Sequence, residues 1–334
     1  MIVGRNAALA QELDAMAWPA AYTVRSVGAI EVGVLDIDRL RTNLERFAPS
    51  LIISTIGYNS PDRAEQDRTI TQARNHWAVA DLADAAGALD IPLIHLSSDQ
   101  VFAGDKTDPY LETDQPDAIS VFGQSQAAGE AEIRAHCRRH VILRTGWLFG
   151  VRGHNMLRTM LSLGRRGGRV HVPNDHVSGP TPARELCTAL RQVGLQLLDD
   201  RAGHAGATIH FCGTPAATLY DFARGALSRA ISFQVAPDLI PITPNRFGVT
   251  GAPARRTELD CSVAAARFGL VQPDWHSALA DCVEEICQTE QASLRDLDPL
   301  VAQPGPVSYR SFQPEPSRRF VLPLGVGIGR RRTG

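Results

Sequence analysis

Hydroxyl, carboxylate and amide side chains follow one apolar stretch of the sequence directly. Residues 92–96 read as a buried strand, and Ser97-Ser98-Asp99-Gln100 comes immediately after it. Hydroxyl groups at the end of a strand could hydrogen-bond the oxygen of a carbonyl substrate, and a neighbouring carboxylate could orient them. Serine and aspartate also cap ordinary turns. The residues alone therefore leave both a substrate-positioning site and a plain loop open.

A second candidate is the turn after the opening apolar residues, Gly4-Arg5-Asn6-Ala7-Ala8-Leu9-Ala10. Dinucleotide-binding folds place glycines at the first, fourth and seventh positions of such a turn, which lets backbone amides approach a pyrophosphate. Here only Gly4 is a glycine, and Ala7 and Ala10 add methyl groups at the other two positions. The turn predicts weak dinucleotide binding, and a simple strand-to-helix connection is the alternative.

The elements that must position these groups alternate between strands and helices over residues 1–150. Apolar strands are predicted at 1–4, 51–56, 92–96 and 141–144, and helices at 7–18, 39–47, 73–88 and 123–138. This alternation predicts an α/β fold with a doubly wound, Rossmann-like parallel sheet. Such sheets bind ligands beyond the carboxyl ends of their strands. The expected site therefore lies in the loops after Val3, Ile56, Leu96 and Leu143.

Beyond residue 150 the pattern becomes looser. Helices are predicted at 155–163, 183–198, 219–230 and 276–287, with Pro- and Gly-rich loops between them. We interpret 1–150 as a dinucleotide-binding domain and 151–287 as a smaller α+β substrate lobe that includes part of the sheet edge. From residue 288 the periodicity ends and prolines cluster, so 288–334 is expected to be a disordered tail.

Composition excludes several classes of protein. The 334 residues are 44% hydrophobic and 21% charged, which is typical of a globular protein, and a net charge of -2 gives no case for nucleic-acid binding. No apolar run reaches the roughly 20 residues of a membrane span, and Glu12 and Asp14 argue against a secretory signal. Six cysteines are scattered without metal-ligand spacing, so we expect plain thiols, no metal and a reducing cytoplasm.

Several motifs occur in order along the chain and together resemble the dTDP-4-dehydrorhamnose reductase family, a branch of the extended short-chain dehydrogenases. The resemblance covers about residues 2–287. It is carried by Asp36-Ile37, Ile56-Gly57-Tyr58-Asn59, Ser98-Asp99-x-Val-Phe, Glu112-Thr113-Asp114, Val121-Phe122-Gly123 with Gly129-Glu130, Arg144-Thr145-x-Trp147, and Asn174-Asp175 with Gly179-Pro180-Thr181.

The resemblance implies a reductase of rhamnose biosynthesis that uses NADP(H) or NAD(H) to reduce a 4-keto-6-deoxy sugar nucleotide. It implies a homodimer or a protein partner as the assembly. Ser98 stands at the position of the catalytic threonine or serine. Cofactor contacts are implied at Gly4, Ala8, Leu9, Ala10, Asp36, Ile37, Ile56, Gly57, Tyr58 and Asn75, and substrate contacts at Ser98, Asp99, Gln100 and Trp147. A core aromatic is the alternative reading of Trp147.

The chain departs from the family at its catalytic pair. The family has Tyr-x-x-x-Lys, in which tyrosine protonates the carbonyl oxygen and lysine lowers the tyrosine pKa and holds the nicotinamide ribose. Phe122 and Gln126 stand at these positions, and Lys106 is the only lysine in the chain, so no shifted copy of the pair exists. We therefore expect an impaired enzyme. The alternative is a non-catalytic pseudo-reductase that serves as a sugar-nucleotide-binding or regulatory subunit.

The preferred cofactor depends on the end of the second strand. An acidic residue there favours NAD(H), whereas a nearby arginine accommodates the 2′-phosphate of NADP(H). No acidic residue is apparent at this strand end in the sequence, and Arg25 is close to it. The sequence predicts weak cofactor binding with a preference for NADPH.

Overall fold

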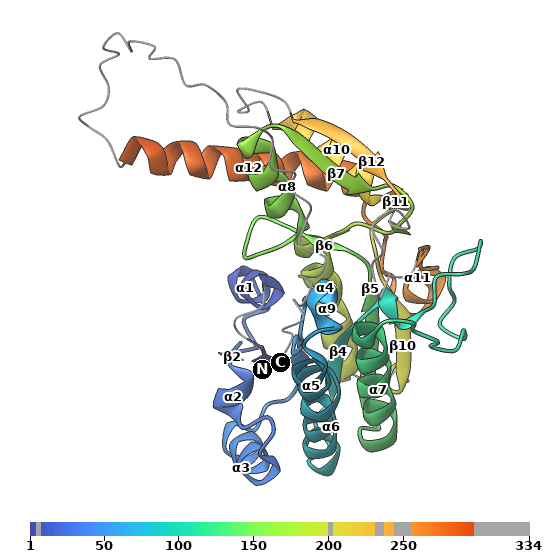
Figure 1. Cartoon of the computed structure of the whole chain (residues 1–334). Coiled ribbons are helices and arrows are strands. Elements are labelled where there is room, and N and C mark those ends of the chain that lie inside the picture. Colours follow the sequence, from blue (N-terminus) through green and yellow to red (C-terminus); the bar gives the residue numbers. More distant parts are fainter. Residues whose placement is uncertain (5–7, 200–202, 231–236, 244–254, 297–334) are drawn as a thin grey trace, which may run out of the picture.

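The centre of the protein is a six-stranded parallel sheet (Figure 1). The computed structural model describes residues 1–4, 8–199, 203–230, 237–243 and 255–296. The strands lie in the order β2, β1, β3, β4, β5 and β10. Their bounds are Ile2–Val3 (β1), Ser26–Val27 (β2), Ile52–Ser54 (β3), Leu93–Ser98 (β4), His140–Thr145 (β5) and Ala207–His210 (β10). The predicted α/β class with a parallel, Rossmann-like sheet is confirmed.

Helices cover both faces of the sheet because successive strand residues point to opposite sides. Ile52 and Leu93 face one layer, whereas Ile53 and Ile94 face the other. The first layer contains α2 (Ala29–Val32), α3 (Ile37–Phe47), α6 (Ala78–Ala88) and α7 (Val121–His136). The second contains α1 (Ala8–Ala15), α9 (Ala183–Asp199) and α11 (Ser262–Phe268).

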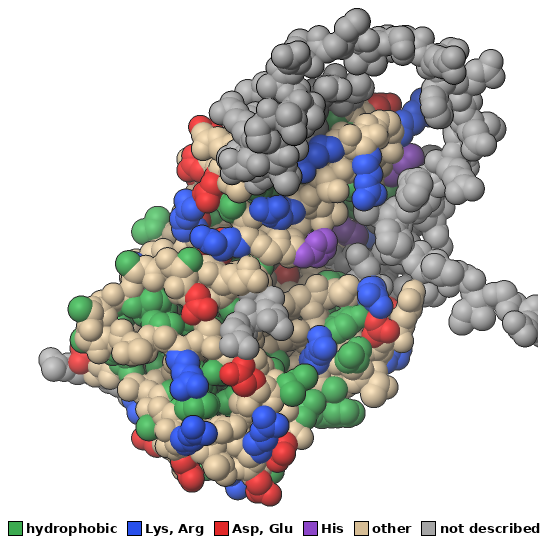
Figure 2. Space-filling model, turned by 90° about the vertical axis from the view of Figure 1, so that its left-hand side faces the viewer, with side chains coloured by type: hydrophobic (Ala, Val, Ile, Leu, Met, Phe, Trp, Pro, Cys, Tyr) green, Lys and Arg blue, Asp and Glu red, His purple; other side chains and the backbone are tan. Residues whose placement is uncertain are grey.

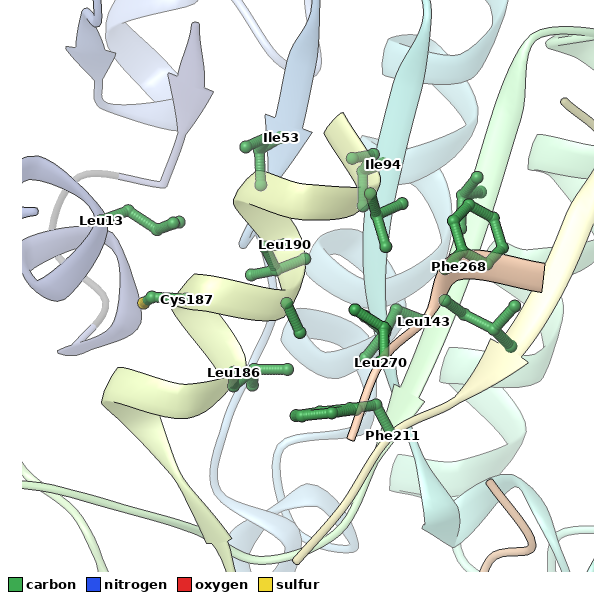
Figure 3. Close-up of a cluster of buried hydrophobic side chains, with 14 of the residues drawn as sticks. Leu13, Ile53, Ile94, Leu143, Leu186, Cys187, Leu190, Phe211, Phe268 and Leu270 are labelled. Atoms are coloured by element: carbon green, nitrogen blue, oxygen red, sulfur yellow. The ribbon is translucent and has the colours of Figure 1, made fainter. Parts of the chain in front are cut away.

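Helix α9 packs across the middle of the second layer (Figure 3). Its buried residues recur at helical spacing, from Leu186 through Leu190 and Val193 to Leu197. They pack with Ile53, Ile94 and Leu143 of the sheet and with Leu13 of α1 in one buried cluster. Burying one such leucine fully stabilises the fold by about 1.5–3 kcal/mol. Helix α9 and strand β10 therefore belong to the sheet unit although both come after residue 150.

A smaller unit stands over the carboxyl ends of the strands (Figure 1). Its helices α8 (Met156–Arg166), α10 (Leu219–Arg229) and α12 (Trp275–Asp296) pack with a parallel pair, β7 (Arg169–Pro173) and β12 (Asp238–Ile242). Two short pairs connect it to the sheet unit: β6 (Leu148–Phe149) with β9 (Thr181–Pro182), and β8 (Val177–Ser178) with β11 (Ala217–Thr218). Phe149, Phe222 and Trp275 form the centre of its core.

The predicted end of the last helix is wrong. Helix α12 continues to Asp296, beyond residue 288 where the sequence predicts the tail to begin. Leu279, Val283 and Ile286 anchor this helix in the core, and the polar residues 288–290 continue it without a buried side chain. The remainder of the predicted tail, 297–334, lies outside the described residues. Within the described part, no helix is both long and apolar enough to span a bilayer.

Candidate functional site

The strand order reverses between the parallel strands β1 and β3, which is where sheets of this type bind ligands. Gly4 follows β1 with φ +116°, and a Cβ there would lie 2.5 Å from Thr55 Oγ1. The Thr55 hydroxyl donates to the carbonyl of Val3 at 3.2 Å, which holds the two strand ends together. Only glycine fits this backbone, so the first position of the predicted pyrophosphate turn keeps its family shape.

The rest of that turn is described only from Ala8 onward, because Arg5, Asn6 and Ala7 lie outside the described residues. Ala8 is half-buried against the loop at Gly153, where a Cβ would lie 2.6 Å from the Ala8 methyl. Leu9 and Ala10 are buried in the core between α1 and the sheet. Their side chains therefore pack α1 onto the sheet, and only their backbone could serve a cofactor.

The loop after β3 is connected to α7 by Asn75. This residue is buried on a π-helical turn, η1 (Ala73–Trp77), within the predicted helix 73–88. Its Oδ1 accepts from the backbone N–H of Tyr58 at 2.6 Å, and its Nδ2 donates to Ser125 Oγ at 2.9 Å. Ile56 is buried and Gly57 half-buried beside it. The structure therefore brings Ile56, Gly57, Tyr58 and Asn75 together, as the resemblance implies.

Phe122 and Gln126 lie one turn apart on α7 beside this loop. Phe122 packs with Ala64 and Tyr58 in a small buried cluster. The Tyr58 hydroxyl donates to Asp67 Oδ2, and this hydrogen bond raises the pKa of Tyr58. The one phenol in this cluster is therefore engaged by a carboxylate, and Phe122 adds no proton donor.

Gln126 is 5% exposed, and its Oε1 has no hydrogen-bond partner within the described structure. Its Nε2 lies 3.8 Å from the position of a Cβ on Gly57. A buried acceptor without a partner costs about 1–3 kcal/mol, and such orphans commonly mark ligand sites. The amide is thus suited to accept a hydrogen bond from a bound hydroxyl.

Replacing Gln126 with methionine should raise the free energy of unfolding of the ligand-free protein by about 1 kcal/mol, because it removes the orphaned acceptor and retains the volume. Urea unfolding measures this difference. Gln124→Met on the exposed side of the same helix is the matched control. A loss of stability in Gln126→Met would show that the amide is already satisfied.

Ser98, Asp99 and Gln100 form a polar shelf at the carboxyl end of β4, where η2 (Asp99–Val101) begins. The Ser98 hydroxyl donates to Asp99 Oδ1 at 3.0 Å and accepts from the backbone N–H of Gln100 at 3.1 Å. Asp99 Oδ2 accepts from the hydroxyls of Ser178 and Thr257. With 2% exposure, Asp99 lies beneath the shelf, whereas Ser98 and Gln100 are half-buried.

Trp147 lies on the loop between β5 and β6 and is half-buried. Its carbonyl accepts from the backbone N–H of Thr181 at 2.6 Å, which connects this loop to β9. The side chain belongs to none of the buried hydrophobic clusters of the described residues. The surface is hollowed between the two units, with basic and histidine side chains above the hollow (Figure 2).

Asp36 begins α3 by accepting from the backbone N–H of Arg39 at 3.2 Å, and Ile37 is packed on the core below. The predicted position of Arg25 near the carboxyl end of the second strand is wrong. Arg25 precedes β2, so it lies at the amino end of that strand, where its guanidinium stacks 4.0 Å from the Phe47 ring. The strand instead ends next to Glu31, whose carboxylate accepts from Gly28 N–H at 3.3 Å. The Arg39 guanidinium donates to the backbone carbonyl of Glu31.

A buried ion pair beneath the shelf was not predicted. Arg144 of β5 donates to both carboxylate oxygens of Glu130 on α7, at 2.8 and 2.6 Å, and Ser97 Oγ donates to the same carboxylate at 2.6 Å. Burial alone would raise the pKa of Glu130, but Arg144 reverses this effect and the pKa is lowered. Glu130 and Arg144 both occur in the motifs quoted for the family resemblance. Their opposite charges next to apolar residues were the feature of the sequence that could have predicted the ion pair. Thr257 belongs to no motif.

The parallel sheet, the glycine at its switch point and the second unit over its carboxyl edge are the features of a Rossmann-like α/β protein. The chain belongs to the family described as the RmlD substrate binding domain, whose model matches residues 1–288. The resemblance found in the sequence is thereby confirmed.

Known proteins of similar sequence cover most of the chain. The dTDP-4-dehydrorhamnose reductase of Sinorhizobium fredii is 29% identical over 280 residues, which is 83% of this chain and 94% of that protein. The enzyme of the same name from Aggregatibacter actinomycetemcomitans is 30% identical over 261 residues, 77% of this chain and 88% of that protein. The relatives thus extend over both units.

Solved structures show the same fold. The structure of dTDP-4-dehydrorhamnose reductase from Bacillus anthracis in complex with NADP has a TM-score of 0.77 at 24% identity, covering 85% of this chain and 98% of that one. MoeE5 in complex with UDP-glucuronic acid and NAD has a TM-score of 0.68 at 14% identity, covering 86% and 98%.

Proposed function

We propose that this chain is a dTDP-4-dehydrorhamnose reductase-like protein that binds a nicotinamide cofactor and a nucleotide sugar but reduces the sugar slowly. The observation that carries the proposal is the pair Phe122 and Gln126 on one face of α7, beside an otherwise retained site. A general acid typically contributes about 10²–10⁴ in rate. Its loss leaves binding intact and removes most of the turnover.

The residues present fit a dinucleotide. Gly4 gives the chain its sharp turn directly after β1, at φ +116°, and the orphaned Gln126 Oε1 is an acceptor for a ribose hydroxyl. NAD(P)H, when bound, supplies a hydride. The loop from Ile56 to Tyr58 would hold the cofactor from the side of β3, Ser98 would hydrogen-bond the sugar carbonyl, and Trp147 would cover the sugar.

The second candidate is a pseudo-reductase that binds a sugar nucleotide or regulates a partner without turnover. It is favoured by the engagement of the Tyr58 hydroxyl with Asp67, which leaves no free phenol beside Phe122. Under either function we place the protein in the cytoplasm, as a homodimer or with a protein partner. A reducing environment there would preserve its six free thiols.

Isothermal titration calorimetry with NADPH, NADH and a dTDP-sugar tests the proposal. We expect binding of the sugar nucleotide, and binding of the cofactor that tightens when Ala7 is replaced by glycine. Asn43→Ala on the outer helix α3 is a control that should change neither affinity. Absence of heat for both ligand classes in a folded protein would overturn the proposed function.

The cation that affects cofactor choice should be Arg39 rather than Arg25. Arg39 stands in the first turn of α3, on the ligand side of the sheet, whereas Arg25 is at the opposite end of β2. We expect Arg39→Ala to weaken NADPH binding about tenfold, because it removes one partly exposed contact to the 2′-phosphate. The same change should weaken NADH binding less than twofold. Arg25→Ala is the matched control, and an equal effect of both variants on NADPH would contradict the assignment.

A further inference from the structure

Asp99 is a buried carboxylate that is held entirely by hydroxyl and amide groups. Its Oδ1 accepts from Ser98 at 3.0 Å, and its Oδ2 accepts from Ser178 at 2.6 Å and from Thr257. Among the described residues, none of its hydrogen-bond partners is an arginine, lysine or histidine. A carboxylate removed from water without a cation favours its protonated form.

The position of Asp99 connects this carboxylate to the site. Ser98 is the preceding residue, it is half-buried at the carboxyl end of β4, and it stands where the proposed substrate carbonyl would lie. Its hydroxyl donates to the Asp99 carboxyl group, and the residue is only half-buried, so a bound substrate could reach it. A protonated Asp99 would donate to Ser98 Oγ and so free the serine hydroxyl to donate outward.

We propose that Asp99 supplies, through the hydroxyl of Ser98, the proton that the missing tyrosine would otherwise give to the carbonyl oxygen. This inference rests on the proposed function. Ser98 is the group that touches the substrate, and Asp99 is a positioning residue and proton source that acts only through Ser98. The pair explains how a slow reduction could persist in a site with Phe122.

NAD(P)H, when bound, would supply the hydride that forms a C–H bond at the carbonyl carbon, and the π electron pair would move to the carbonyl oxygen. That oxygen takes the proton of Ser98 Oγ, which in turn takes the proton of Asp99. The products are the sugar alcohol, NAD(P)⁺ and the Asp99 carboxylate, which is reprotonated from solvent through Ser98 after the product leaves.

The surroundings of Asp99 make the proton transfer through Ser98 faster at lower pH. Burial raises the pKa of Asp99, and the hydrogen bonds from Ser178, Thr257 and Ser98 offset only part of this effect. The neighbouring titratable groups are the thiols of Cys212 and Cys261, 3.7 Å apart, and the pKa of Cys212 is raised, so that thiol stays neutral over the working range. Protonation of Asp99 therefore governs the route.

Single-turnover oxidation of bound NADPH by a dTDP-4-keto-6-deoxy sugar, measured from pH 5 to 9, tests this inference. We expect the rate of the unmodified protein to rise as pH falls. Asp99→Asn should lower the rate at pH 6 about 10²-fold and abolish the pH slope, because an amide fills the same space without an acidic proton. Asp117→Asn is the matched control, since the Asp117 carboxylate accepts from Ala103 N–H and an asparagine oxygen can accept the same bond.

A second background separates proton supply from structure. In the Phe122→Tyr/Gln126→Lys protein, Asp99→Asn should cost less than threefold, because tyrosine then gives the proton. A large loss there as well would mean that Asp99 merely holds the shelf. A wild-type pH slope in Asp99→Asn, or no cofactor oxidation despite calorimetric binding of both ligands, would also overturn the relay. Absence of ligand binding would instead overturn the proposed function.

Discussion

Replacing Phe122 with tyrosine and Gln126 with lysine together should accelerate reduction of a dTDP-4-keto-6-deoxy sugar by about 10²–10⁴-fold. The two positions lie four residues apart on α7 and therefore share one face of the helix. Phe122→Tyr adds a phenol where the ring already stands. Gln126→Lys adds the charge that lowers the pKa of that phenol from about 10.

The two changes should be strongly non-additive. Tyrosine without lysine keeps its high pKa, and lysine without tyrosine has no phenol to activate, so each single variant should remain within about tenfold of the unmodified protein. NADPH oxidation measured for the unmodified protein, both single variants and the double variant shows this. Phe122→Tyr with Gln124→Lys is the matched control, because Gln124 is exposed. Equal rates in all five proteins would contradict the assigned positions.

Arg144→Met should lower the free energy of unfolding by about 3 kcal/mol, because it removes the buried bidentate cation of Glu130 and leaves that carboxylate only the partly exposed Arg134. Arg144 is 1% exposed and Glu130 is fully buried, so water cannot replace the lost partner. Urea unfolding at pH 7 measures the change. Arg169→Met at the exposed pair with Asp238 is the matched control and should change stability by no more than about 0.5 kcal/mol. Similar small losses in both variants would contradict the role of the buried pair.

The buried pair of Glu130 and Arg144 also predicts that the free energy of unfolding falls at acid pH. The pKa of Glu130 is lowered from its ordinary value of 4.5 in the folded protein, so its contribution is fully present above that value and is lost as pH falls through the folded pKa. Glu130→Gln should remove this part of the pH dependence. Urea midpoints measured between pH 3 and 7 for both proteins provide the comparison.

Periodicity and motif order were enough to predict the sheet, because buried parallel strands are short apolar runs that differ plainly from the helices between them. The same information placed Ser98 and Phe122 at neighbouring strand and helix ends. It could not show that Asp99 is buried, because this depends on Ser178 and Thr257, which are distant in the sequence.

The misplacement of Arg25 has a similar cause. The strand β2 has only two residues, so its apolar signal was too weak to show at which end Arg25 stands. Helix α12 was predicted too short because the residues directly after Cys287 are polar, so the apolar helical period is interrupted there. Long-range packing and short elements therefore account for what sequence reasoning missed.

We propose that the site binds its ligands while the substituted pair Phe122 and Gln126 removes most of the turnover. The most direct test is the steady-state rate of NADPH and NADH oxidation by the unmodified protein at saturating dTDP-4-keto-6-deoxy sugar. We predict a rate at least about 10²-fold below 1 s⁻¹, the low end of ordinary enzymes, with both ligands bound. A rate near 1 s⁻¹ would contradict this proposal. It would require an efficient proton donor at some position other than 122.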